Sequence, residues 1–324
     1  MTNDRPLILI TGNLIDQAVM RIGQRFDHLQ IAASDPQQVS SEDRLRVRGL
    51  AAGMTGVSAD VIDAFPALEI IASYGVGYDG VDAVHAASRG IMVTNTPDVL
   101  TEEVADTAIA LLLNTLRGFS RAETWLRAGR WVTDGAYPLS PGTLRNRRIG
   151  IFGMGRIGLA IARRLEGFDV ALAYHNRRKV EDVDYPYYPT LQALAEACDV
   201  LINVAPSTPQ TAKAVDAGVL QALGPDGVLI NIGRGATVDE AALIEALQTK
   251  TIFAAGLDVF DDEPHVPQAL LEAETAVLLP HVGSASVHTR VAMADLLVDN
   301  LESWFEHNRA VTPVPETRDV KRRV

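Results

Sequence analysis

The first hundred residues alternate short apolar runs with segments whose apolar residues recur at helical spacing. The apolar runs cover residues 6–11, 49–54, 68–73 and 91–95, and the segments with helical spacing cover 15–26, 61–64 and 81–88. A short apolar run is typical of a buried strand, and strands that alternate with helices are typical of a parallel sheet covered by helices. This part of the chain therefore predicts a small α/β domain.

The alternation of strands and helices stops after this domain. Pro97 disfavours helix at Thr96 and supplies no N–H, so the pattern ends there. Residues 102–116 then predict a long helix, and because this helix is apolar on almost every side, most of its surface should be buried. Residues 125–144 predict an irregular arm that reaches over a second subunit, because they contain loop-forming and aromatic residues: Trp131, Gly135, Tyr137, Pro138, Pro141 and Gly142.

A second alternation begins after residue 148. Strands are expected at 149–152, 169–174, 200–204, 228–232, 252–259 and 276–279, and helices at 159–165, 191–197, 219–223 and 241–247. Six strands of this kind make a Rossmann sheet. The helical segment 287–304 follows the completed sheet and is expected to return to the first domain, with residues 312–324 as a tail. We therefore predict a discontinuous domain, residues 1–98 and 286–324, and a second domain, residues 99–285.

Composition agrees with two globular domains and excludes several classes of protein. The chain has 324 residues, which is more than a single core usually holds, and 47% of them are apolar. Its 29 basic and 41 acidic residues give a net charge of −12, which argues against nucleic acid or an anionic membrane as a partner. No apolar run is long enough to span a membrane, and the polar start Met1–Arg5 is unlike a signal peptide.

Cysteine usage adds to this picture. The single cysteine, Cys198, lies in an apolar stretch and predicts a buried core residue, which suits a reducing cytoplasm. Nothing in the sequence has the spacing of a metal site, so no metal is expected.

A glycine-rich turn lies between the strand at 149–152 and the helix that follows it. In the spacing G-x-G-x-x-G each glycine has a separate role, since Gly153 permits the tight turn, Gly155 lets a phosphate reach the backbone, and Gly158 lets helix and strand pack closely. The free N–H groups of the helix start then face a pyrophosphate. The predicted cofactor-binding residues of this turn are Gly153, Met154, Gly155, Arg156, Ile157 and Gly158.

Three chemically active side chains follow three later strands. Arg234 follows the strand at 228–232, Glu263 the strand at 252–259, and His281 the strand at 276–279. Ligands of open α/β sheets bind beyond the carboxyl ends of strands, so these groups should meet at one edge. Together they suit the reduction of a carbonyl by hydride transfer. His281 would donate a proton, Glu263 would hold the imidazolium, and Arg234 would clamp an oxygen of a 2-oxo acid.

The end of the strand after the glycine turn indicates which dinucleotide binds. NAD-specific sites place an acid about 20 residues beyond the glycines, where it binds the ribose 2′-OH. Here that strand ends in Asn176, Arg177 and Arg178. The two arginines would pair with a 2′-phosphate while Asn176 donates a hydrogen bond, so the sequence favours NADP(H) over NAD(H).

Four motifs resemble the signatures of the D-isomer-specific 2-hydroxyacid dehydrogenases, and the resemblance runs from about Pro6 to Phe305. They are Gly153–Gly158, Asn231–Gly235, Gly256–Phe260 with Glu263-Pro264, and Leu279–Gly283. The resemblance implies a Rossmann cofactor domain inserted into a discontinuous flavodoxin-like substrate domain, and a homodimer formed through the long helix and the arm after it.

The same resemblance implies roles for individual residues. Arg234, Glu263 and His281 would be catalytic, with Arg234 and His281 also touching the substrate. The loop Gly75, Val76 and Gly77 would hold the substrate carboxylate through the N–H groups of Val76 and Gly77. Asp258 would bind the nicotinamide carboxamide. Further positions that would line the cofactor are Thr107, Thr211, Ile232 and Gly283.

Within this family the chain resembles one branch in particular. Formate dehydrogenases on this scaffold carry glutamine where Glu263 stands, whereas Asn95–Thr101, Leu223-Gly224-Pro225 and His281–Ser284 look like glyoxylate and hydroxypyruvate reductases. The expected activity is NADPH-dependent reduction of glyoxylate to glycolate and of hydroxypyruvate to D-glycerate. Two alternatives remain open: a reductase of larger 2-oxo acids such as 2-ketogluconate or hydroxyphenylpyruvate, and a dinucleotide-sensing scaffold like the corepressors that share this fold.

Overall fold

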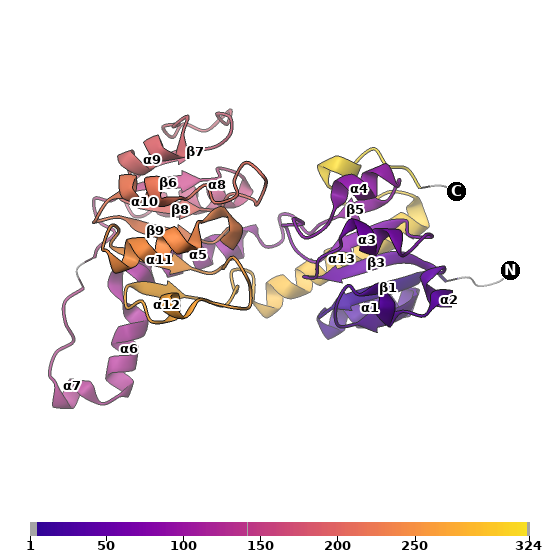
Figure 1. The fold of residues 1–324 in the computed structure, drawn as a ribbon, viewed down its shortest axis with the longest axis horizontal. Coiled ribbons are helices and arrows are strands. Elements are labelled where there is room, and N and C mark those ends of the chain that lie inside the picture. Colours follow the sequence, from indigo (N-terminus) through magenta and orange to yellow (C-terminus); the bar gives the residue numbers. More distant parts are fainter. Residues whose placement is uncertain (1–4, 141, 323–324) are drawn as a thin grey trace. The chain divides into compact units, whose positions relative to one another are not determined.

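The computed structural model describes residues 5–140 and 142–322, and the chain forms two compact units (Figure 1). One unit contains the residues up to Leu100 and those from Ser286 onward, and the other runs from Thr101 to Ala285. Over the described ranges, no helix is long and apolar enough to cross a membrane. The same ranges contain no group of three or more His, Cys, Asp or Glu residues that could hold a metal ion.

The discontinuous unit is built on a five-stranded parallel sheet with strand order β2-β1-β3-β4-β5. This is the flavodoxin-like order that the resemblance implied. Its strands are β1 (Leu7–Gly12), β2 (Asp27–Ile31), β3 (Val47–Gly53), β4 (Ile70–Ser73) and β5 (Met92–Thr94). Its helices are α1 (Asp16–Arg25), α2 (Ser41–Arg44), α3 (Ala59–Asp63), α4 (Ala83–Ser88) and α13 (Val287–His307), with short 3₁₀ turns η1 (Pro36–Gln38) and η3 (Pro315–Thr317).

Two parts of this unit differ from the sequence-based expectation. Strand β2 was not predicted, because its sequence DHLQI is mostly polar. It pairs with β1 alone at the edge of the sheet, and its side chains are exposed or only partly buried, so the strand needs no continuous apolar run. The prediction of a tail after residue 312 was wrong for its described part. Val314 is 1% exposed, and the fully buried Thr317 exchanges hydrogen bonds with Val93 of β5.

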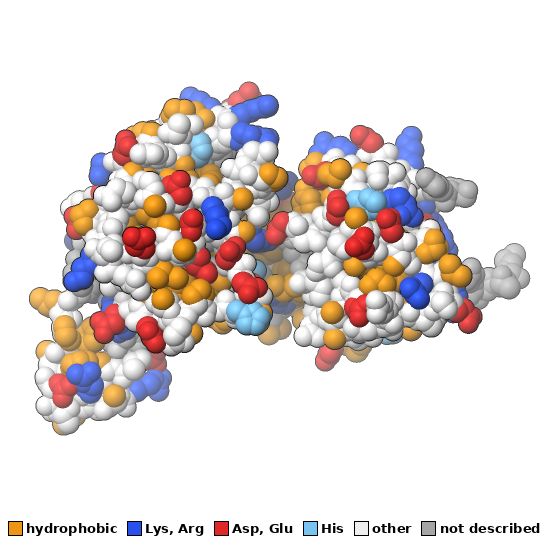
Figure 2. All heavy atoms as spheres, in the orientation of Figure 1, with side chains coloured by type: hydrophobic (Ala, Val, Ile, Leu, Met, Phe, Trp, Pro, Cys, Tyr) orange, Lys and Arg blue, Asp and Glu red, His pale blue; other side chains and the backbone are white. Residues whose placement is uncertain are grey.

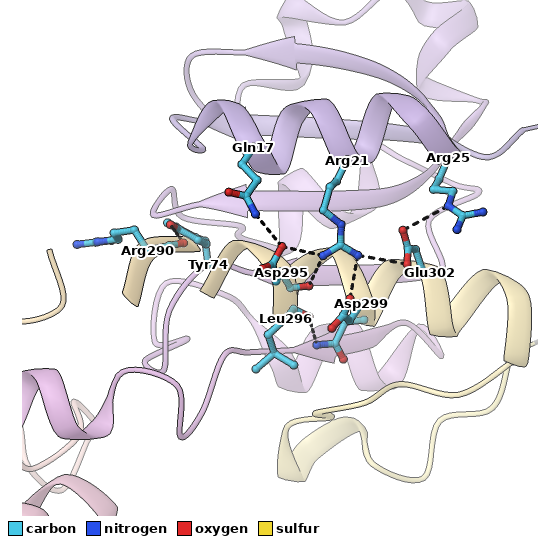
Figure 3. Close-up of polar contacts among 10 residues, drawn as sticks. Gln17, Arg21, Arg25, Tyr74, Arg290, Asp295, Leu296, Asp299 and Glu302 are labelled. Carbon is cyan, nitrogen blue, oxygen red and sulfur yellow. Dashed lines mark hydrogen bonds and ion pairs between the residues drawn. The ribbon is translucent and has the colours of Figure 1, made fainter. Parts of the chain in front are cut away.

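Helix α13 is fixed to α1 by a network of ion pairs (Figure 3). Arg21 of α1 reaches Asp295 and Asp299, both at 2.9 Å, and Glu302 at 3.3 Å. Partly exposed pairs contribute little one by one, but one guanidinium shared by three carboxylates fixes the register of the two helices. The network therefore joins α13 to α1 within their own unit.

The continuous unit is built on a six-stranded parallel sheet with order β11-β10-β9-β8-β6-β7, the predicted Rossmann sheet. Its strands are β6 (Arg148–Phe152), β7 (Ala171–His175), β8 (Val200–Asn203), β9 (Val228–Asn231), β10 (Ala254–Leu257) and β11 (Ala276–Leu278). Its helices are α5 (Thr101–Arg117), α6 (Phe119–Arg127), α7 (Arg130–Thr133), α8 (Arg156–Glu166), α9 (Leu191–Ala197), α10 (Ala217–Leu223), α11 (Glu240–Gln248) and α12 (Gln268–Leu271), with η2 (Gly235–Thr237).

The core of this unit confirms two expectations from the hydrophobic pattern. The long helix α5 packs against α8 and β10 and buries Ala105, Leu111 and Leu112 almost completely. Cys198 is 3% exposed, and burial raises the pKa of its thiol to about 12. It is a core residue, as its apolar surroundings predicted.

The arm after α5 is more regular than expected. Residues 125–144 were predicted to be irregular, but α6 extends to Arg127 and α7 follows directly; Pro141 lies outside the described residues. The guanidinium of Arg130 stacks on Trp125 at 3.5 Å from the ring centre, and Tyr137 meets that ring edge-on. These contacts join α6, α7 and the segment after them, a stretch whose glycines and prolines suggest a loop. Figure 2 shows hydrophobic side chains on the surface of this arm.

Candidate active site

The glycine turn after β6 has three different backbone environments. Gly153 has φ +107°, and a Cβ there would lie 2.7 Å from the nitrogen of Ala205. A Cβ at Gly158 would collide with the carbonyl oxygen of Gly153, whereas a Cβ at Gly155 would meet nothing within 4 Å. The turn is therefore closed on the sheet side and open at Gly155, where a phosphate could approach the backbone.

Helix α8 starts directly from this turn and offers its first amide groups. Its N-cap is Gly155, and no side chain caps it. Uncapped N–H groups and the positive end of the helix dipole together favour an anion at this position. The backbone therefore fits the pyrophosphate of a dinucleotide.

The end of β7 lies beside the glycine turn through Asn176. Its Oδ1 accepts a hydrogen bond from the N–H of Met154 at 2.6 Å, and its Nδ2 donates to the Met154 carbonyl at 3.4 Å. Asn176 thus holds the turn with both ends of its amide, which leaves one N–H for a ligand. Arg177 and Arg178 are exposed, and neither has an ion-pair or hydrogen-bond partner within the described ranges. The two cations are available at the position where a 2′-phosphate was expected.

The backbone of Arg234, just after β9, is fixed by hydrogen bonds to its carbonyl group. The Arg234 carbonyl accepts hydrogen bonds from Nδ2 of Asn231 at 3.1 Å and from the Thr237 hydroxyl at 2.6 Å. Asn203, at the end of β8, donates to both of these side chains. A Cβ at Gly235 would overlap the carbonyl of Phe260, so the glycine lets the Arg234 loop approach the loop that carries Glu263.

His281 and Glu263 form a hydrogen-bonded pair. Nδ1 of His281 lies 2.7 Å from Oε2 of Glu263, and Oε1 of Glu263 accepts the N–H of Phe260 at 3.0 Å. Partial burial would raise the pKa of Glu263, but the hydrogen bonds from His281 and Phe260 and the charges of His281 and Arg234 outweigh it and lower the pKa. Because Nδ1 is engaged, Nε2 is the ring nitrogen that can meet a ligand.

Asp258 clamps the segment that carries His281. Its two carboxylate oxygens accept the N–H groups of Val282 at 2.7 Å and Gly283 at 2.8 Å, and its carbonyl accepts the N–H of His281 at 2.9 Å. This clamp holds His281 in a left-handed conformation, φ +52°. Burial outweighs these hydrogen bonds and raises the pKa of Asp258. The nicotinamide role assigned to Asp258 stays a prediction, and the structure adds a positioning role.

The remaining expected cofactor residues lie around the same sheet edge. Thr107 donates to the carbonyls of Glu103 and Gly283, and Thr211 donates to the carbonyl of Pro206 at 2.6 Å. Ile232 is 6% exposed, so at most a small part of it can meet a ligand. The expected substrate loop, Gly75–Gly77, belongs to the other unit and follows β4.

Known proteins resemble this chain over most of its length. Residues 109–283 match the family model for the NAD binding domain of D-isomer specific 2-hydroxyacid dehydrogenases. Glyoxylate/hydroxypyruvate reductase A from Arabidopsis thaliana is 46% identical over 90% of this chain and 93% of its own length. The chain belongs to the D-2-hydroxyacid dehydrogenase family.

Two further relatives of this dehydrogenase differ in the substrate for which they are named. An NADPH-dependent glyoxylate/hydroxypyruvate reductase from Sinorhizobium meliloti, solved with NADP and malonate, is 58% identical, with a TM-score of 0.96 over 99% of both chains. A hydroxyphenylpyruvate reductase from Plectranthus scutellarioides is 48% identical over 80% of this chain and 82% of its own.

Three residues behind Arg234 have no role predicted from the sequence, although one of them, Asn231, lies within the motif Asn231–Gly235. Asn203, Asn231 and Thr237 form the buried polar network behind Arg234. A signal was present, because β8 and β9 have the same sequence, VLIN, and each ends in asparagine. An asparagine at the carboxyl ends of two neighbouring parallel strands places two amides side by side.

Proposed function

We propose that this dehydrogenase is an NADPH-dependent reductase of small 2-oxo acids, with glyoxylate and hydroxypyruvate as substrates and glycolate and D-glycerate as products. The observation that carries the proposal is the 2.7 Å hydrogen bond between His281 and Glu263. Gly235, next to Arg234, packs closely against Phe260 in the loop that carries Glu263. The relatives that are named for glyoxylate and hydroxypyruvate support the substrate class.

Each catalytic group has one role in this proposal. NADPH, when bound, supplies the hydride that forms the new C–H bond at C2 of the substrate. His281 donates the Nε2 proton to the carbonyl oxygen, and Glu263 stabilises the imidazolium before that transfer. Arg234 stabilises the negative charge that develops on the same oxygen, and its planar guanidinium can bind two oxygens at once. The N–H groups of Val76 and Gly77 bind the substrate carboxylate.

The preference for NADPH rests on charge. Asn176, Arg177 and Arg178 provide two exposed cations and no carboxylate at the end of β7. A 2′-phosphate gains two ion pairs there, whereas the ribose of NADH meets no acidic acceptor. The Sinorhizobium meliloti relative, solved with NADP, supports this assignment.

A homodimer is the proposed assembly, with α6 and α7 covering a second copy of the chain. Along the arm, Trp131, Val132 and Leu139 are 64%, 93% and 96% exposed. Monomeric proteins seldom expose neighbouring large apolar side chains to this extent, and such patches mark protein interfaces. The resemblance to dimeric family members supports the same face.

A substrate panel with both cofactors tests the function. The purified chain is mixed with NADPH or NADH and with glyoxylate, hydroxypyruvate, 2-ketogluconate or hydroxyphenylpyruvate, and cofactor oxidation is followed. We expect kcat/KM for the two small acids with NADPH to exceed that for the larger acids by about tenfold or more. Preference for a larger acid would reassign the substrate. NADPH binding without oxidation by any 2-oxo acid would instead indicate a dinucleotide sensor.

A further inference from the structure

In the expected substrate loop, Gly75–Gly77, two backbone N–H groups donate no hydrogen bond to a described residue, whereas two backbone carbonyl groups each accept one. Neither the N–H of Val76 nor that of Gly77 donates to an acceptor in the described part of the chain. The carbonyl groups of the same peptides are both bonded: the N–H of Thr96 donates to Gly75 at 2.8 Å, and Nδ2 of Asn95 donates to Val76 at 2.8 Å. Both donors follow β5, the strand next to β4.

Peptide geometry converts those two hydrogen bonds into a direction for the N–H groups. In a planar trans peptide, the C=O of one residue and the N–H of the next point in opposite directions. No cis peptide bond occurs in this loop. The bond from Thr96 to Gly75 therefore sets the direction of the Val76 N–H, and the bond from Asn95 to Val76 sets that of the Gly77 N–H. Both N–H groups are turned away from β5.

Asn95 is itself held by the C-terminal segment. The Thr312 hydroxyl donates to the Asn95 carbonyl at 2.6 Å, and the N–H of Asn95 donates to the Thr312 carbonyl at 3.4 Å. Asn300, fully buried in α13, donates to the Thr312 hydroxyl at 2.8 Å and accepts its N–H at 2.9 Å. Hydrogen bonds in such a chain polarise and strengthen one another.

The same helix also holds the residue before the loop. The hydroxyl of Tyr74 donates to the carbonyl of Arg290 at 2.7 Å, and Figure 3 shows both residues near the first turn of α13. The loop is thus fixed at its root through Tyr74 and along its backbone through Asn95. Each of these contacts joins it to the segment after Ser286.

We propose that Asn95 is a positioning residue for the substrate carboxylate, and that Thr312 and Asn300 support it from the C-terminal segment. Asn95 touches no reacting atom. It orients the Gly77 N–H, which together with the Val76 N–H binds the carboxylate. This inference rests on the reductase function proposed above.

Substitutions at Asn95 test the proposal through the charge of the substrate. In Asn95→Ala the donor to Val76 is lost, and we expect the KM for glyoxylate to rise about tenfold with kcat changed less than about threefold, because the carboxylate is bound equally before and during the reaction. Asn95→Asp keeps the size of the side chain but adds a negative charge, so its KM should rise further. For methyl glyoxylate, which has no carboxylate, kcat/KM should stay within about twofold of the parent in both variants.

Thr312 supplies a second test with a conservative rescue. Thr312→Val removes the hydroxyl that reaches Asn95 and should raise the glyoxylate KM, whereas Thr312→Ser keeps that hydroxyl and should restore it. Thr317→Val is the matched control, because it deletes another hydroxyl of the same segment that bonds to Val93. It should lower the unfolding temperature and leave the glyoxylate KM unchanged.

The outcomes separate this proposal from the function on which it rests. If the parent enzyme reduces glyoxylate but Asn95→Ala keeps the parent KM, or if glyoxylate and methyl glyoxylate lose activity equally, the positioning role is overturned and the reductase stands. An equal KM increase in Thr312→Val and Thr317→Val would overturn the support from the tail. A parent enzyme that reduces no 2-oxo acid would remove both proposals.

Discussion

At the scale of single residues, two carboxylates of the site have pKa values shifted in opposite directions by their surroundings. Asp258 is 1% exposed and spends both oxygens on backbone N–H groups, and burial raises its pKa. Glu263 is partly exposed, and the groups around it lower its pKa in spite of partial burial. The first carboxylate therefore shapes a loop, while the second remains a charged partner for His281.

The lowered pKa of Glu263 predicts a pH dependence. A group whose pKa is depressed by folding contributes stability above its unfolded pKa and loses that contribution as the pH falls through the folded pKa. The ion pair with His281 should thus persist to a pH below the usual range of a glutamate. In Glu263→Gln the acceptor remains but the charge is lost, so kcat should fall about tenfold or more, and the loss of stability that the parent shows as the pH falls through the folded pKa of Glu263 should be absent.

The free energy of unfolding measured against pH, together with kcat at neutral pH, checks both effects. An unchanged kcat in Glu263→Gln, or the same acid-side loss of stability in both proteins, would contradict the assigned role. His281→Gln is the companion variant: it removes the proton donor and should lower turnover by about 10²-fold or more while NADPH binding persists.

The residue at the end of β7 predicts a switch of cofactor. Asn176→Asp keeps an acceptor for the Met154 N–H but places a negative charge where the 2′-phosphate is expected, and that carboxylate can accept the ribose 2′-OH of NADH. We expect the ratio of kcat/KM for NADPH to that for NADH to fall about tenfold or more. The double variant Arg177→Ala with Arg178→Ala should weaken the binding of NADPH and leave the binding of NADH unchanged. Equal losses for both cofactors would contradict the phosphate assignment.

At the scale of elements, two glycines at the junction of β6 and α8 should have different roles, Gly158 in the fold and Gly155 in ligand binding. Gly158→Ala places a Cβ against the carbonyl of Gly153 and should lower the stability of the cofactor-free protein by about 1–3 kcal/mol. Gly155→Ala meets nothing within 4 Å, so the fold should tolerate it, while the methyl group obstructs the pyrophosphate. Thermal unfolding with and without NADPH distinguishes the two. Gly155→Ala should keep the unfolding temperature of the free protein and lose the increase caused by NADPH.

The success of sequence reasoning differed between elements for physical reasons. Buried parallel strands such as β6 and β9 are continuous apolar runs, and their pattern is sufficient to identify them. Strand β2 lies at the edge of its sheet with side chains that are exposed or partly buried, so its sequence has no apolar run. Arg130 of α7 stacks on Trp125 of α6, and sequence spacing does not reveal this contact.

The site divides in the same way. Arg234, Glu263 and His281 could be proposed as catalytic residues from the sequence because each follows an apolar strand and each has a distinctive chemistry. The role that we propose for Asn95 could not be predicted, because it depends on a hydrogen bond to Val76 that joins the segments after two different strands. Asparagine is common at strand ends, and its hydrogen-bond partner can be named only when the order of the strands in the sheet is known.

At the scale of the whole molecule, the chain returns to its first unit to complete it. Helix α13 contributes Met293, Leu297, Leu301 and Trp304 to the interior, each at most 1% exposed, and the following segment bonds to β5. The first hundred residues therefore do not bury their own sheet fully. The C-terminal segment supplies both that cover and, by our inference, the support of the substrate loop.

Assembly is the last property that the exposed arm predicts. Val132 and Leu139 are almost fully exposed, so a dimer that covers them gains apolar burial of about 1.5–3 kcal/mol for each side chain. Val132→Asp with Leu139→Asp would place two carboxylates in that interface, where desolvation without a partner opposes association. We expect the parent to have the mass of a dimer by light scattering and the double variant to have that of a monomer. Val84→Asp, at a position 72% exposed on α4, is the control and should remain dimeric; a parent that is monomeric at every concentration would contradict the proposed assembly.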